Sequence, residues 1–124
     1  MIKWSEREWI IVRRLYDAVG PCPPQSEKNV VVSSIARLIG RSPNSVCMRL
    51  RNFGAQDQKA RAKYGRKFLS GEWVPGDGKG CWNRFYFRMR IDHPAVFERK
   101  LKEACKPVHD GLFEWLKQAC RIAA

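Results

Sequence analysis

The first apolar pattern along the chain predicts a helix that begins just after Ser5. Ser5 and Glu8 have the spacing of a capping box, in which each side chain accepts the backbone N–H of the other residue. The apolar residues that follow recur at the intervals of one helix face: Trp9, Val12, Leu15, Tyr16 and Val19. Trp4 and Trp9 have the spacing of a hydrophobic staple. Gly20 and the prolines after it end the predicted helix.

The next pattern, over residues 30–53, predicts two short helices joined by a tight turn. Apolar residues keep helical spacing on both sides of one glycine: Val32, Ile35, Ala36 and Ile39 before it, and Val46, Leu50 and Phe53 after it. Small Ala36 lets the two helices approach closely, and Gly40 can adopt the turn conformation. Ser42 can cap the second helix, where Pro43 suits the first position. We therefore expect a helix-turn-helix core at about 30–53, although ordinary αα-hairpins also have this spacing.

The second of these helices carries side chains suited to reading DNA bases. Because its apolar stripe faces inward, the other positions between 44 and 51, Cys47 among them, are expected on the remaining faces. Asn44 suits the N6/N7 edge of adenine and Arg51 the O6/N7 edge of guanine. Met48 either meets the methyl group of thymine or 5-methylcytosine, or pads the helix boundary. The expected base-reading residues are Ser42, Asn44, Ser45, Met48 and Arg51.

Residues 85–91 fit either a strand or a helix. Apolar residues alternate there as in a strand. The same stretch also has a helix face: Trp82, Phe85, Tyr86 and Met89. A strand would make a hairpin at about 67–91, the wing of a winged helix, and would bring Lys79 near a minor groove or the backbone. A helix would extend the core, so we expect a mainly α, compact helical domain, with the winged helix as the alternative.

Two further helices are predicted at about 94–123. Pro94 suits the first position of one helix, which Asp92 or His93 can cap. Its apolar stripe comprises Val96, Phe97, Leu101 and Ala104. The last helix begins near Gly111 and is apolar on more than one face, so it packs either on the core or on a second copy of the chain as a homodimer.

The length of the chain indicates its number of domains, and its charge indicates the kind of partner it binds. The 124 residues suit a single domain over 1–124, and 24 Lys plus Arg against 12 Asp plus Glu give a net charge of +12. Such a charge favours a polyanionic partner, nucleic acid first and an anionic membrane surface second. Between positions 37 and 67 there are nine basic residues and one acid, Asp57. The residues expected on the DNA backbone are Arg37, Arg41, Arg49, Asn52, Lys59, Arg61, Lys63, Arg66, Lys67, Lys79, Arg84 and Arg88.

We expect no enzymatic activity, no metal and no cofactor. The five cysteines are widely spread without a C-x-x-C pair, and His93 and His109 are isolated from each other. Neither paired carboxylates nor a nucleophile with an adjacent base stands out. No apolar run approaches the roughly 18 residues of a membrane span, and the first residues lack a secretory signal, so we expect a cytoplasmic protein with reduced cysteines.

Three segments, Gly40–Val46, Met48–Phe53 and Gly65–Gly71, together resemble a bacterial DNA-binding module. That module is often found at the N-terminus of HNH-type restriction endonucleases that cut modified DNA. The resemblance covers about the first 70 residues and includes the opening helix with its early tryptophan. It implies a small helical domain that binds duplex DNA and, in some members, reads 5-methylcytosine. Because His93 and His109 make no His-Asn-His cutting site, we expect a binding module, either freestanding or cut from a longer nuclease chain.

Three functional hypotheses follow. The main one is a duplex-DNA-binding module that reads the major groove through the helix at 42–53, as in bacterial or phage restriction and defence systems. The second is a single-strand or RNA-binding protein whose exposed aromatics stack on bases: Tyr64, Trp73 and Tyr86. The third is a transcription regulator or a phage-type interaction adaptor, which meets an acidic protein and dimerises through its last helix.

Overall fold

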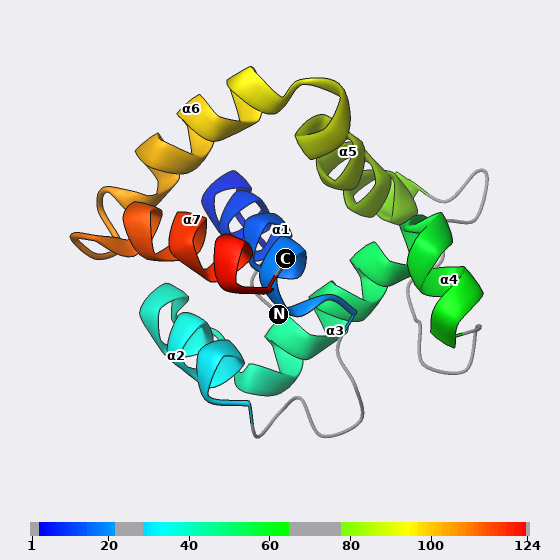
Figure 1. The fold of residues 1–124 in the computed structure, drawn as a ribbon, viewed down its shortest axis with the longest axis horizontal. Coiled ribbons are helices and arrows are strands. Elements are labelled where there is room, and N and C mark those ends of the chain that lie inside the picture. The colour runs from blue at the N-terminus through cyan, green and yellow to red at the C-terminus, as the bar shows by residue number, and fades with distance from the viewer. Residues whose placement is uncertain (1–2, 22–28, 65–77, 124) are drawn as a thin grey trace.

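The computed structural model describes residues 3–21, 29–64 and 78–123, with the side chains of this set except those of 78–81 and 119–123. Within these ranges the chain is helical and contains no strand (Figure 1). The helices are α1 (Glu6–Val19), α2 (Val30–Ile39), α3 (Pro43–Gln56), α4 (Gln58–Tyr64), α5 (Gly78–Asp92), α6 (Pro94–Cys105) and α7 (Leu112–Ala123). None of them combines the length and the apolar character that crossing a membrane requires. The expectation of a mainly α fold is confirmed.

Helix α1 lies in the middle of the fold and packs against α3, α5, α6 and α7 (Figure 1). Its predicted capping box is present, since the Ser5 hydroxyl accepts the Glu8 N–H at 3.3 Å and the Glu8 carboxylate accepts the Ser5 N–H at 2.9 Å. The staple is also present, with the rings of Trp4 and Trp9 5.9 Å apart. Every residue from 9 to 16 is buried, so α1 is covered on all sides and not only along its apolar stripe.

Helices α2 and α3 are joined by the three residues 40–42. Gly40 adopts the left-handed conformation, with φ 74° and ψ 29°, and the Arg41 N–H donates to the Ala36 carbonyl at 2.9 Å. Ser42 caps α3 and Pro43 begins it, both as predicted. The inward residues on the two sides of the turn are fully buried: Val32, Ile35, Ala36, Val46, Leu50 and Phe53.

Residues 85–91 are helical, so the strand that a wing would need is not formed there. The reason is tertiary packing, because Asn83, Tyr86 and Phe87 are spaced to fall on one buried face of α5. The other arm of the predicted hairpin falls on residues 65–77, which lie outside the described ranges. Helix α4 was not expected from the sequence, because its seven residues carry little apolar periodicity.

Helices α6 and α7 follow the predicted positions, with differences at single residues. His93 is the N-cap of α6 but its side chain makes no capping bond, and Asp92 instead bonds Arg88. Val96, expected on the inward stripe, is 37% exposed. Within α7, Leu112 and Leu116 are buried, and the helix packs on α1. This favours core packing for its apolar face, and a homodimer through α7 stays a prediction.

Candidate nucleic-acid interface

The outward face of α3 gathers the residues predicted to read bases. Ser42, Asn44 and Met48 are exposed, with Met48 at 40%, and Ser45 and Arg51 are half-buried. All five belong to α3 or to its N-cap and lie off the stripe that packs inward. Cys47 differs from its expected position, because it is completely buried beside Val46 and Leu50 instead of lying on an outer face.

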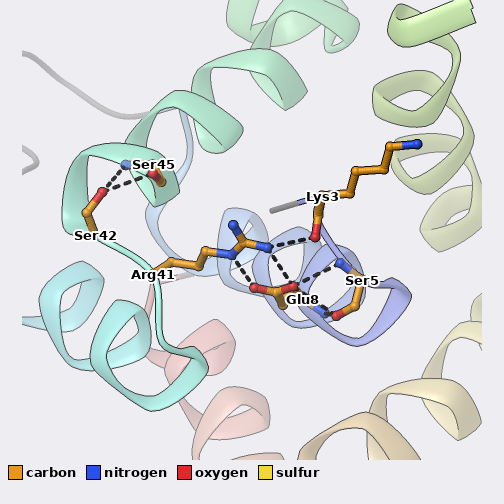
Figure 2. A network of polar contacts seen from close by, with 6 residues as sticks. All are labelled: Lys3, Ser5, Glu8, Arg41, Ser42 and Ser45. Atoms are coloured by element: carbon orange, nitrogen blue, oxygen red, sulfur yellow. Dashed lines mark hydrogen bonds and ion pairs between the residues drawn. The ribbon is translucent and has the colours of Figure 1, made fainter. Parts of the chain in front are cut away.

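Two of these side chains, those of Ser42 and Ser45, make hydrogen bonds within the first turn of α3. The Ser42 hydroxyl accepts the Ser45 N–H at 3.1 Å and donates to the Ser45 hydroxyl at 2.9 Å (Figure 2). Both serines therefore fix the first turn of α3. Asn44 and Met48 lie on the exposed side of the same helix, so this face presents one amide and one thioether to solvent.

Arg41, a predicted backbone contact, instead ties the turn to the start of α1. Its Nε and Nη2 donate to the Glu8 carboxylate, the Nη2 bond being 3.0 Å, and Nη2 also donates to the Lys3 carbonyl at 2.9 Å (Figure 2). The hydrogen bond from Arg41 is the main reason why the pKa of Glu8 lies below its ordinary value. The two side chains are only 15% and 13% exposed, which makes this ion pair less screened than one in open solvent.

Arg49, another predicted backbone contact, is held against the core. Its guanidinium lies 3.9 Å from the ring centroid of Trp9 and 4.7 Å from that of Trp4. Its Nη1 donates to the Asn83 side-chain oxygen at 2.8 Å, which links α3 to α5. Burial lowers the pKa of Arg49 to about 10. This contact holds α3 in place, and Arg49 is not presented with the outer residues of the helix.

The other predicted backbone residues fall on several elements. Arg37, Lys59 and Lys63 are exposed on α2 and α4, whereas Asn52 and Arg61 are half-buried. Arg84 and Arg88 are exposed on α5, where Arg88 bonds Asp92 at 2.7 Å. Arg66 and Lys67 lie outside the described residues, as does the side chain of Lys79.

The one acidic residue of this basic region is engaged within the fold. The Asp57 carboxylate accepts the Tyr16 hydroxyl at 2.6 Å and the Lys59 N–H at 3.0 Å. Burial, together with this bond, raises the pKa of Tyr16. Asp57 thus ties the start of α4 to α1.

Two features escaped the sequence reasoning. The first is a cluster in which Asp17 accepts Arg13 at 2.8 Å and Arg90 at 2.9 Å, with Arg14 at 3.8 Å. The separation of Arg90 from α1 along the chain hides this cluster from any local pattern. It joins α1 to α5, as does the bond from Arg13 Nε to the Phe87 carbonyl.

The second is the exposure of two aromatic rings on α5. Trp82 and Phe85 are 54% and 50% exposed, whereas Tyr86, expected outside as a stacking ring, is buried. The helix face predicted from the sequence grouped Trp82 and Phe85 with Tyr86, so the apolar spacing did not separate the exposed rings from the buried one. Tyr64, the other described aromatic expected to stack, is half-buried, and Trp73 lies outside the described ranges.

Among the described residues, no group of three or more His, Cys, Asp or Glu side chains is placed to hold a metal ion. Cys47 and Cys105 are buried. Comparison of the chain with protein-family models, curated proteins and solved structures gives no significant match.

Proposed function

We propose that this chain is a double-stranded DNA-binding module in which α2 and α3 form a helix-turn-helix and α3 reads the major groove. The observation that carries the proposal is the outward face of α3. Asn44 and Met48 are exposed beside half-buried Arg51, directly after a three-residue turn that contains a left-handed glycine. An α-helix fits the major groove, where an amide and a guanidinium distinguish adenine from guanine.

The inner side of α3 supports this role because it is braced at two points. Arg41 joins the turn before α3 to Glu8 on α1. Arg49 joins the middle of α3 to the Trp9 ring and to Asn83 on α5. Side chains held on a fixed helix lose little freedom on binding, which increases both affinity and specificity.

The charge distribution supports a nucleic-acid partner. We infer that the exposed cations on α2, α4 and α5 contact phosphates: Arg37, Lys59, Lys63, Arg84 and Arg88. Phosphate contacts of this kind position a protein on the duplex without reading its sequence.

Met48 indicates which base the module senses. Its exposed thioether lies on the same helix as Asn44, where it can contact the methyl group of thymine or 5-methylcytosine. We therefore infer that 5-methylcytosine is one base the module senses, in a bacterial or phage restriction or defence setting. The chain acts there as a cytoplasmic binding module without a catalytic step, alone or joined to a nuclease.

Binding to matched nucleic acids tests the proposal. The purified protein is titrated with duplexes that contain cytosine or 5-methylcytosine in several contexts, and with single-stranded DNA and RNA, at two salt concentrations. We expect tighter binding to duplex than to single strands, with a steep loss of affinity at higher salt. A further gap between methylated and unmethylated duplexes would identify a modified-DNA reader. Failure to bind any duplex would contradict the proposal and favour a protein-binding adaptor.

A further inference from the structure

A stack of aromatic rings runs from the core to the surface at α5. The guanidinium of Arg49 lies over Trp9, whose ring stacks on Tyr86 with centroids 5.2 Å apart and planes 16° from parallel. Tyr86 in turn stacks on Trp82, at 6.1 Å and 25°. Trp9 and Tyr86 are buried, so the inner part of the stack is rigidly held.

The outer end of this stack is open. Trp82 is 54% exposed although Tyr86 stacks against its ring. Phe85, 50% exposed, stands at 84° to Trp82 with the ring centroids 6.0 Å apart. The two rings therefore form an exposed corner, with a flat indole on one side and a phenyl ring on the other. Large apolar rings that stay in water at such a fixed position are typical of a binding surface.

The surroundings of this corner are cationic. By sequence, α5 carries four basic residues, Lys79, Arg84, Arg88 and Arg90, against the single acid Asp92. In the structure Arg88 pairs with Asp92 and Arg90 pairs with Asp17 of α1, so the net positive charge of α5 comes from Lys79 and Arg84. Arg84 and Arg88 are exposed on the same helix as Trp82 and Phe85. A ligand that combines a flat apolar ring with a nearby anion matches both properties of this surface.

We propose that Trp82 and Phe85 bind an unpaired nucleobase of single-stranded nucleic acid, with the adjacent phosphates near Arg84 and Arg88. The base extends the stack of Arg49, Trp9, Tyr86 and Trp82 by one more ring. Every base has a π-face, so the site is tolerant of sequence. The two rings are separate from the outward face of α3, and the site shares only Arg84 and Arg88 with the phosphate contacts proposed for duplex DNA.

The charge decides between this ligand and an apolar protein partner. A protein surface that covers two aromatic rings does not need anions beside them, whereas a nucleotide always brings a phosphate. The exposed residue Arg84 and the net positive charge of α5 therefore favour a nucleotide over an apolar protein surface.

A short single-stranded oligonucleotide that carries the fluorescent base 2-aminopurine tests the site. We expect the fluorescence of the probe to be quenched on binding, because stacking on Trp82 quenches an unpaired base. Trp82→Ala is expected to weaken binding roughly 5- to 150-fold, as for other base-stacking rings, and to remove the quenching. Trp82→Phe, which keeps a ring, should retain much of both.

Ile91→Ala is the matched control, because Ile91 is an equally exposed apolar residue of α5, at 50%, without a ring. It should bind the probe as the unchanged protein does, and thermal unfolding of each variant checks that it is folded. Equal loss in Ile91→Ala and Trp82→Ala would overturn the proposal, as would unchanged probe binding by a folded Trp82→Ala protein. Loss of self-association in Trp82→Ala, with no probe binding by the unchanged protein, would reassign the corner to a protein interface.

The same variants separate this inference from the duplex-binding proposal. Trp82→Ala should keep its affinity for fully paired duplex. Probe binding without any duplex binding would leave the α5 site standing and contradict the role of α3. Duplex binding without probe binding or quenching would contradict the α5 site and leave the role of α3 standing.

Discussion

Arg41 and Arg49 lie in the most basic part of the chain, yet both are used inside the fold. Arg41 bonds Glu8 and the Lys3 carbonyl, and Arg49 covers Trp9 and bonds Asn83. A guanidinium does this well because its flat surface stacks on rings while its edge donates hydrogen bonds. We therefore expect substitution of either arginine to change DNA binding by displacing α3, and not by removing a phosphate contact.

Replacing Arg49 should destabilise the protein. Arg49→Ala removes a partly buried cation–π contact with Trp9 and the charged hydrogen bond to Asn83. We expect a loss of about 2–3 kcal/mol in the free energy of unfolding, measured by denaturant titration. Arg37→Ala is the control, because Arg37 is exposed and its loss should change stability by less than about 0.5 kcal/mol. Equal stability of the two variants would contradict the bracing role.

The ion pair between Glu8 and Arg41 should appear in the pH dependence of stability. The pKa of Glu8 is lowered in the folded state, mainly by the Arg41 hydrogen bond, so its contribution is complete above about pH 4.5, the ordinary value. It is lost as the pH falls through the lowered folded value. Glu8→Gln should therefore reduce stability near neutral pH and lessen its decline below pH 4.5. If the free energy of unfolding varied with pH in the same way in the unchanged protein and in Glu8→Gln, the ion pair would contribute nothing to stability.

At the scale of elements, the turn between α2 and α3 depends on one glycine. Gly40 has φ 74°, and a Cβ atom added there would meet nothing within 4 Å. Substitution therefore costs conformational strain and no steric clash. We expect Gly40→Ala to lower the free energy of unfolding by about 1–2 kcal/mol, and Gly40→Asn to cost less because Asn tolerates this conformation. Equal losses for both variants in thermal or chemical unfolding would point to a cause other than the backbone angle.

Helices α3 and α4 should differ in what they contribute to DNA binding. Arg51→Ala removes a proposed base contact, so it should flatten the preference among duplexes by about 1–3 kcal/mol. Lys63→Ala removes a proposed phosphate contact, so it should weaken all duplexes alike and reduce the salt slope by about one. Equilibrium titrations over several duplexes and salt concentrations measure both effects. If both variants lost the same affinity for every duplex whatever its sequence, this would argue against base reading by α3.

The starts of α1 and α3 are predictable from the sequence because their signals are local, whereas α3 was expected to end at residue 53 and continues to Gln56. Ser5 and Glu8 are three residues apart, as are Ser42 and Ser45, and the caps form as the spacing indicates. The outward positions of Asn44 and Met48 follow from helical periodicity in the same way.

Other features depend on contacts between distant parts of the chain. Cys47 is buried because α3 is covered on a wider arc than its apolar stripe suggests. Arg49 reaches Asn83, and Asp17 reaches Arg90, across separations that leave no trace in a local pattern. The helical state of residues 85–91 was decided by packing on α1 and α3, since the apolar spacing fitted a strand as well.

On the scale of the whole molecule, positive charge is spread over the chain, whereas the side chains proposed to contact bases are confined to α3 and α5. The net charge of +12 supplies attraction to a polyanion over the whole chain. The proposed base contacts lie on two small surfaces, the outward face of α3 for reading sequence and the aromatic corner on α5 for sequence-tolerant stacking. A packed centre around α1 holds the helices that carry both surfaces, as Figure 1 shows.

The central claim is that α3 reads the major groove of a duplex. The most direct test uses a preferred duplex, selected from random sequences, in which single purines are replaced by their 7-deaza analogues. The replacement removes the N7 acceptor in the major groove and leaves the minor-groove edge unchanged. We predict a loss of affinity at specific positions, and the disappearance of that loss in Asn44→Ala or Arg51→Ala. Unchanged affinity for 7-deaza duplexes at every position would contradict the claim.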